Sequence, residues 1–143
     1  MRKNGQIIII EDDEDDAEIL FDLITSLNYK NEIKIINDST LVIDYLKQPN
    51  VKPFLIISDI NMPKLNGYEL RDRIISDPLV DAKCIPYIFC TTAAQPDIVN
   101  EGFKRNIQGY FHKTNDYAKY KENVKLLVDY WKTSLLPNEA AYY

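Results

Sequence analysis

The chain has 143 residues, with 22 acidic and 17 basic side chains and a formal net charge of −5. This length favours one domain with a buried core and is short for two ordinary domains. The negative charge disfavours binding to phosphate backbones or anionic lipids, so neither nucleic acid nor a membrane surface is an expected partner.

The apolar segments of the chain are short. Each is the length of a strand, well below the ~20 residues that a membrane-spanning helix requires, and the first follows a start that lacks the apolar core of a signal peptide. The sequence therefore predicts a cytoplasmic protein. The two cysteines, Cys84 and Cys90, have neither the spacing of a redox pair nor that of zinc ligands, and we expect free, reduced and mostly buried thiols.

Five short apolar runs alternate along the chain with stretches of helical periodicity. In residues 16–27 the apolar side chains recur at the spacing of a helix with one buried face, at Ile19, Leu20, Leu23, Ile24 and Leu27. In chain order, the pattern predicts strands at 6–10, 32–36, 54–58, 86–90 and 109–112, and helices at 16–27, 40–48, 67–76, 96–105 and 117–136.

This alternation predicts the fold class. Strands made almost entirely of Ile, Val, Leu and Phe are typical of a sheet that is buried on both faces, and helical crossovers require parallel neighbours. We expect an α/β protein, a doubly wound (βα)5 three-layer sandwich with a parallel five-stranded sheet. No linker-like composition interrupts the chain, so we expect one domain over 1–143, with a core at about 5–135 and a loose tail at 136–143.

Polar and charged side chains follow four of the predicted strands. In a sheet of this type the functional crevice lies beyond the carboxyl ends of the strands. We therefore expect three carboxylates, one hydroxyl and one ammonium to converge at one edge of the sheet: Glu11, Asp12, Asp59, Thr91 and Lys113.

These groups suit phosphoryl transfer. Asp59 stands before a turn that contains Pro63 and Gly67, where an exposed carboxylate can act as a nucleophile toward phosphorus. Three carboxylates suit a hard divalent cation such as Mg²⁺, and the added charges of the metal and Lys113 make the site neutral. A neutral site can admit a phosphoryl group, and the Thr91 hydroxyl can then hydrogen-bond it.

The other carboxylates of the acidic run are interpreted differently. Residues 13–16 stand at the start of the first predicted helix, where each negative charge gains roughly 0.3–1 kcal/mol from the positive end of the helix dipole. A water-mediated role for Asp13 is a minor alternative. We interpret Asp15, Asp16 and Glu18 as ordinary helix-start residues.

Four segments of the chain carry a resemblance when they are taken in order. They are IIIIEDDEDD, FLIISDINMPKLNGYEL, IPYIFCTTAA and GYFHKT. They resemble the signatures of the response-regulator receiver domain, the CheY-like family of two-component signalling. The resemblance extends over about residues 5–135 and implies a flavodoxin-like fold with strand order 2-1-3-4-5.

The resemblance implies a role for each residue of the site. It implies that Asp59 is the phosphoacceptor and that Lys113 contacts the phosphoryl group. It implies Mg²⁺ as the cofactor, held by Glu11, Asp12, Asp59 and the backbone carbonyl of Asn61.

The resemblance also implies a switch and two partners. Thr91 corresponds to the switch hydroxyl and Tyr110 to the aromatic side chain that turns inward when the threonine moves toward the phosphate. The implied donor is the phosphohistidine of a sensor kinase, with some similarity to regulators of phytochrome-type kinases. Such a protein catalyses its own phosphorylation and slow hydrolysis and is not an enzyme acting on outside substrates. Because no DNA-binding segment follows, we expect a downstream protein to bind the surface of 96–105, 109–112 and 117–136.

One residue departs from the family pattern. The family usually has proline after the lysine, often with a cis peptide bond, whereas this sequence has Thr114. A cis bond before a residue other than proline costs ~2.5–4 kcal/mol, so the loop either turns with a trans peptide or tolerates strain.

Two other functions remain open at this point. A haloacid-dehalogenase-like phosphatase also uses a strand-end Asp with Mg²⁺, but it usually has a second Asp at the position of Asn61. A pseudo-receiver would act as a scaffold without phosphorylation. The aromatic residues of 117–136 are expected mainly in the buried stripe of the last helix, with a homodimer surface as the alternative.

Overall fold

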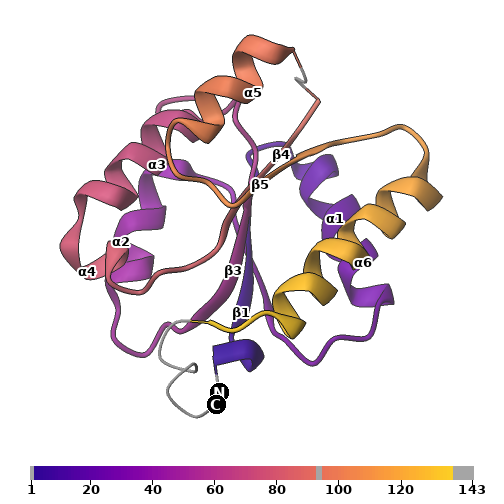
Figure 1. Cartoon of the computed structure of the whole chain (residues 1–143), viewed down its shortest axis with the longest axis horizontal. Helices are drawn as coiled ribbons and strands as arrows, with labels where there is room; N and C mark the ends of the chain where they lie inside the picture. Colours follow the sequence, from indigo (N-terminus) through magenta and orange to yellow (C-terminus); the bar gives the residue numbers. More distant parts are fainter. Residues whose placement is uncertain (1, 93–94, 137–143) are drawn as a thin grey trace.

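The computed structural model describes residues 2–92 and 95–136 (Figure 1). Its five strands form one parallel sheet in the order β2-β1-β3-β4-β5. Each strand begins and ends within one residue of its predicted bounds: β1 (Gln6–Ile10), β2 (Ile33–Ile36), β3 (Pro53–Ser58), β4 (Tyr87–Thr91) and β5 (Gly109–His112). The predicted doubly wound, flavodoxin-like α/β sandwich is confirmed.

The helices also follow the predicted order. The five predicted helices are present, and the four-residue helix α4 was not foreseen because the motif that forms it is short: Asp77 caps the helix and Pro78 opens it. The helices are α1 (Glu14–Ser26), α2 (Val42–Lys47), α3 (Gly67–Ser76), α4 (Pro78–Asp81), α5 (Pro96–Phe103) and α6 (Tyr117–Thr133).

Side-chain alternation along β1 divides the core between the two faces of the sheet. Ile7 and Ile9 pack against α1 and α6, whereas Ile8 and Ile10 pack against the helices of the opposite face. Figure 1 shows α1 and α6 side by side on one face, with α2, α3 and α4 on the other. Both faces of the central strands are therefore closed to water. None of the helices in the described part of the chain is long and apolar enough to span a membrane.

The expectation that every strand is buried on both faces is wrong at the edges of the sheet. β2 and β5 pair on one side only, so their side chains are mostly half-buried, and Ile35 is exposed. Ile19, assigned to the buried face of the first helix, is 44% exposed. The buried stripe of α1 is narrower than the apolar pattern and includes Leu20, Leu23 and Ile24.

Three further expectations about burial need correction. Cys90 is buried, but Cys84, in the loop before β4, is exposed. Of the aromatic residues in α6, Tyr120 is buried whereas Tyr117 and Tyr130 are exposed. Leu136, placed in the loose tail, is buried against the face that α1 and α6 cover. The rest of that predicted tail, 137–143, lies outside the described residues.

The turn from β3 to α3 depends on a close backbone approach. Asn66 caps α3 and forms a capping box with Glu69, which fixes where the helix starts. The next residue, Gly67, donates its backbone N–H to the Ile60 carbonyl at 2.7 Å. A Cβ at Gly67 would lie 2.5 Å from the carbonyl oxygen of Asp59, which no side chain tolerates. The absence of a side chain here lets the helix start beside the end of β3.

We expect Gly67→Ala to lower the free energy of unfolding by about 3 kcal/mol, because the new methyl group meets backbone atoms that cannot move independently. Urea denaturation followed by circular dichroism measures this change. Gly109→Ala is the matched control, since its Cβ would approach only side-chain atoms, the nearest at 3.3 Å. Equal stability of the two variants would contradict the close-approach argument.

Candidate functional site

Backbone hydrogen bonds extend the sheet by one residue beyond the strands and place the site residues. The backbone N–H of Asp59 donates to the carbonyl of Ile10 at 3.0 Å, and that of Lys113 donates to the carbonyl of Thr91 at 2.8 Å. The backbone N–H of Glu11, just after β1, donates to the carbonyl of Ile36 at 3.2 Å. These residues are therefore carried by the rigid sheet, although they stand just outside its strands.

Three carboxylates meet at the carboxyl ends of β1 and β3. Ligand oxygens of Glu11, Asp12 and Asp59 all lie within 4.8 Å of one another, which would allow a single cation to contact them all. Glu11 is buried, Asp59 is half-buried and Asp12 is exposed. The oxygen Oε2 of Glu11 is buried without a hydrogen-bond partner among the described residues. The cluster thus combines strong like-charge repulsion with an oxygen that needs a partner.

The ammonium of Lys113 lies beside this cluster. It forms ion pairs with Glu11 and, at 3.5 Å, with Oδ2 of Asp59. It also pairs at 3.2 Å with Oδ2 of Asp16, which the sequence had suggested was an ordinary helix-start residue. The sequence could not single out Asp16 within a run of six acidic residues, because the orientation of α1 decides which carboxylate of its first turn faces the lysine.

Burial shapes the charge state of the site. The pKa of Glu11 is raised to about 8. Burial is the main cause, the neighbouring ammonium of Lys113 offsets part of the rise, and the carboxylate of Asp59 adds to it. For Lys113, burial opposes the charged form, but the carboxylates around it outweigh that cost and raise its pKa. The lysine therefore stays charged, while the buried glutamate binds protons more tightly than a glutamate in water.

The residues expected to form the switch lie on β4, which is next to β3, and on β5 at the edge of the sheet. Thr91 ends β4 and is buried. Tyr110 on β5 is half-buried, with its ring edge-to-face against Phe89 at a centroid distance of 6.1 Å. Asn61 is exposed in the turn after Asp59.

The peptide bond between Lys113 and Thr114 is trans, as are the others in the described ranges 2–92 and 95–136. The loop that follows β5 therefore turns without the cis bond common in the family, which settles the choice that the sequence left open. Thr114 accepts a hydrogen bond from the backbone N–H of Asp116 at 3.2 Å, just before α6 begins.

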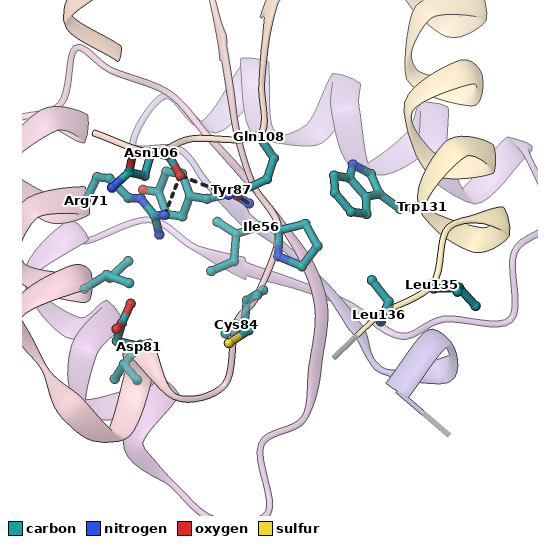
Figure 2. A pocket seen from close by; sticks show the side chains of 14 residues that line it. Ile56, Arg71, Asp81, Cys84, Tyr87, Asn106, Gln108, Trp131, Leu135 and Leu136 are labelled. Carbon is teal, nitrogen blue, oxygen red and sulfur yellow. Dashed lines mark hydrogen bonds between the residues drawn. The ribbon is translucent and has the colours of Figure 1, made fainter. Parts of the chain in front are cut away.

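A separate cavity of about 370 Å³ opens at the other end of the sheet, near the amino ends of β4 and β5 (Figure 2). Arg71 reaches across it and donates to the backbone carbonyl of Asn106 at 2.8 Å, and its guanidinium lies over the ring of Tyr87. Cys84 and Trp131 are part of its lining. None of the clustered carboxylates takes part in this cavity, so the two features are distinct.

The comparison with protein families decides the assignment. A family model of the response regulator receiver domain matches residues 7–125. The chain belongs to this family. It is thus a receiver domain of two-component signalling, a family whose members generally accept phosphoryl groups as signals and bind a divalent metal, with a histidine kinase as the phosphodonor.

Known proteins similar to this receiver domain agree with the assignment. Response regulator Rcp1 of Synechocystis sp. is 26% identical over 137 residues, covering 92% of each chain. The structure of the phosphorylated cyanobacterial phytochrome response regulator RcpA has a TM-score of 0.83 at 23% identity and covers 94% of this chain and 99% of its own. The structure of the Mn²⁺-bound form of Rcp1 has a TM-score of 0.78 at 24% identity and covers 92% of this chain and 97% of its own. At these identities the two structures show a shared fold.

The pKa of Glu11 gives the receiver domain a predicted pH dependence. Between pH 4.5 and about 8 the native protein holds a proton on Glu11 that the unfolded chain releases, so stability falls as pH rises through this window. Glu11→Gln cannot ionise and avoids this loss. We expect the variant to gain roughly 1–3 kcal/mol relative to wild type between pH 5 and pH 8.

Urea denaturation in EDTA at several pH values measures this gain. The control is Glu18→Gln, a change of the same kind at an exposed position of α1. A stability difference between Glu11→Gln and wild type that is constant with pH would show that Glu11 has an ordinary pKa in the folded protein.

Proposed function

We propose that this receiver domain is a phosphoacceptor response regulator in which Asp59 accepts the phosphoryl group of a sensor histidine kinase with Mg²⁺ as the cofactor. The observation that supports this most strongly is the meeting of Glu11, Asp12, Asp59 and Lys113 at one edge of the sheet. These residues are separated by up to about a hundred positions in sequence, and an ordinary fold gives no reason to gather their charges.

The donor set fits Mg²⁺. Glu11, Asp12 and Asp59 offer hard oxygen ligands within 4.8 Å of one another. The buried Oε2 of Glu11 accepts no hydrogen bond from the described residues. We assign the backbone carbonyl of Asn61 as a further ligand by the family resemblance. When bound, Mg²⁺ would neutralise charge on the carboxylates and on phosphoryl oxygens.

Asp59 is the proposed nucleophile. One of its carboxylate oxygens attacks phosphorus, a new O–P bond forms, the P–N bond to the donor imidazole breaks, and the imidazole leaves with the electron pair of that bond. Oδ1 of Asp59 accepts a hydrogen bond from the backbone N–H of Ile60 at 2.7 Å. This bond orients the carboxylate and leaves Oδ2 as the attacking oxygen. The ammonium of Lys113, 3.5 Å from Oδ2, is placed to contact an oxygen of the transferred group.

The proposed switch uses Thr91 and Tyr110. Thr91 lies at the end of β4, next to the strand that carries the phosphoacceptor, so its hydroxyl can hydrogen-bond a phosphoryl group on Asp59. Tyr110 lies on β5, beside β4, and packs against Phe89. A shift of Thr91 would change the space available to the tyrosine ring. The output surface is then that of α5, β5 and α6, where a downstream protein would bind.

The donor is a sensor kinase, and a phytochrome-type kinase is the preferred candidate. Similarity to the cyanobacterial phytochrome response regulator RcpA supports this choice. No observation favours the dehalogenase-like phosphatase, which belongs to a different family, and the pseudo-receiver is an outcome of the test below.

We expect acetyl phosphate with Mg²⁺ to add one phosphoryl group to the wild-type protein and none to Asp59→Asn, because only the aspartate at this position can form the acyl phosphate. Intact-mass spectrometry with and without EDTA measures the gain. Asp22→Asn, on α1 outside the site, should label like wild type.

Each contrary outcome identifies an alternative. Absence of label in the wild type with Mg²⁺ would favour the pseudo-receiver, and equal labelling of Asp59→Asn would contradict the assigned position. Steady hydrolysis of a phosphomonoester over many turnovers would favour the phosphatase. Size-exclusion chromatography of the same samples shows whether phosphorylation changes the oligomeric state.

We expect Mg²⁺ alone to stabilise the protein, since it binds the assembled carboxylates of the folded state. At about ten times its dissociation constant the gain in unfolding free energy is about 1.4 kcal/mol. Urea denaturation with Mg²⁺ or EDTA measures it. Asp12→Asn should lose most of the gain, and a full gain in that variant would place the ion elsewhere.

A further inference from the structure

The ammonium of Lys113 is surrounded by carboxylates from three different parts of the chain. Glu11 follows β1, Asp59 follows β3, and Asp16 belongs to α1. The ion pair with Asp16, at 3.2 Å, is also a direct hydrogen bond. The lysine side chain is only 13% exposed and the Asp16 side chain is 43% exposed, so a largely buried ammonium here meets a carboxylate that still reaches solvent. Partly buried ion pairs of this kind are screened less than fully exposed ones.

Asp16 differs from the other acidic residues at the start of α1. Glu14 and Asp15 are exposed, whereas Asp16 is half-buried. The carboxylate of Asp13 caps the helix by accepting from the backbone N–H of Asp16 at 3.0 Å. This cap fixes the rotation of the first turn, which directs Asp16 and not its neighbours toward Lys113.

The space between the lysine and the sheet is small. Asp16 lines a cavity of only about 10 Å³ together with Glu11, Asp59 and Lys113. That volume is at the lower limit for a single water molecule. On this inner side the ammonium of Lys113 therefore has protein carboxylates, and not water, as its neighbours.

The two other partners of Lys113 have a second role in the proposed function. Glu11 and Asp59 lie with Asp12 in the cluster that fits a cation, whereas Asp16 does not belong to that cluster. When Glu11 and Asp59 turn to a metal ion and a phosphoryl group, their hold on the ammonium weakens. Asp16 has no such competing role and can keep its ion pair.

We propose that Asp16 is a positioning residue that holds the ammonium of Lys113 beside Asp59 while Glu11 serves the metal. The backbone of Lys113 is fixed by its hydrogen bond to Thr91, but four flexible methylene groups separate that backbone from the charge. Asp16 fixes the far end of the side chain. This inference rests on the proposed function, because the position of the lysine matters only if a phosphoryl group arrives there.

The kinetic test compares Asp16→Asn, Asp16→Glu and Asp15→Asn at saturating Mg²⁺ and acetyl phosphate. We expect Asp16→Asn to be phosphorylated roughly three- to tenfold more slowly than wild type, since a loosened lysine stabilises the transition state less. Asp15→Asn removes the same charge from the same helical turn and should stay within roughly twofold. Asp16→Glu keeps the carboxylate and should recover most of the rate.

A second measurement follows the lysine directly. An ion-paired, protected ammonium gives an observable side-chain ¹⁵N signal in nuclear magnetic resonance spectra, and Lys113→Arg assigns it. We expect this signal in wild type and Asp15→Asn, and its broadening or loss in Asp16→Asn. A purely structural role of Asp16 would lower stability and leave the signal of Lys113 unchanged in the folded protein.

The two measurements separate the failure of each proposal. If wild type is phosphorylated and Asp16→Asn matches Asp15→Asn in rate and in ammonium signal, the role of Asp16 is wrong and the proposed function stands. If wild type gains no phosphoryl group while the signal of Lys113 still depends on Asp16, the proposed function is wrong and the contact is real. A slow Asp16→Asn with a lost ammonium signal supports both.

Discussion

Repulsion among carboxylates at one edge of the sheet is the constraint on which the site depends. Glu11, Asp12 and Asp59 are held close together by strands that the core fixes in place, and two of them are shielded from water. The backbone hydrogen bonds that extend the sheet prevent these groups from separating. Below about pH 8 a proton on Glu11, whose pKa is raised mainly by burial, relieves part of the repulsion. The ammonium of Lys113 compensates part of the charge, and a divalent cation would compensate the rest. The free protein is in this sense prepared for a positively charged ligand.

The core makes this arrangement rigid. Alternating isoleucines of β1 pack on both faces of the sheet, so a shift of that strand would disturb both layers at once. The turn after β3 is equally constrained, since Gly67 lies against the backbone of Asp59 and Ile60. Stability thus comes from the middle of the sheet and charge collects at its end, where rigid neighbours keep the carboxylates from moving apart.

An aromatic cluster connects this edge with the helices beyond it. The ring of Phe89 contacts those of Tyr68, Tyr87 and Tyr110, each edge-to-face, with centroids 5.5–6.1 Å apart. The hydroxyl of Tyr68 donates to the carbonyl of Ile98 on α5 at 2.6 Å. Phe89 lies two residues before Thr91 on β4, so the end of that strand is connected by direct contacts to α3 and β5, and through Tyr68 to α5.

The sequence by itself determined the strands, their parallel direction and the residues that follow them, whereas the order of the strands came from the family resemblance. A run of branched apolar residues and the polar residue that follows it, such as Asp59, are adjacent in the chain. Such local patterns can be recognised without the structure. Only the tertiary structure decided which residue of a set faces where. It exposed Ile19 and Cys84, buried Leu136, and turned Asp16 rather than Asp15 toward Lys113. Such choices depend on the rotation of a helix and on neighbours distant in the chain, and periodicity alone does not specify either.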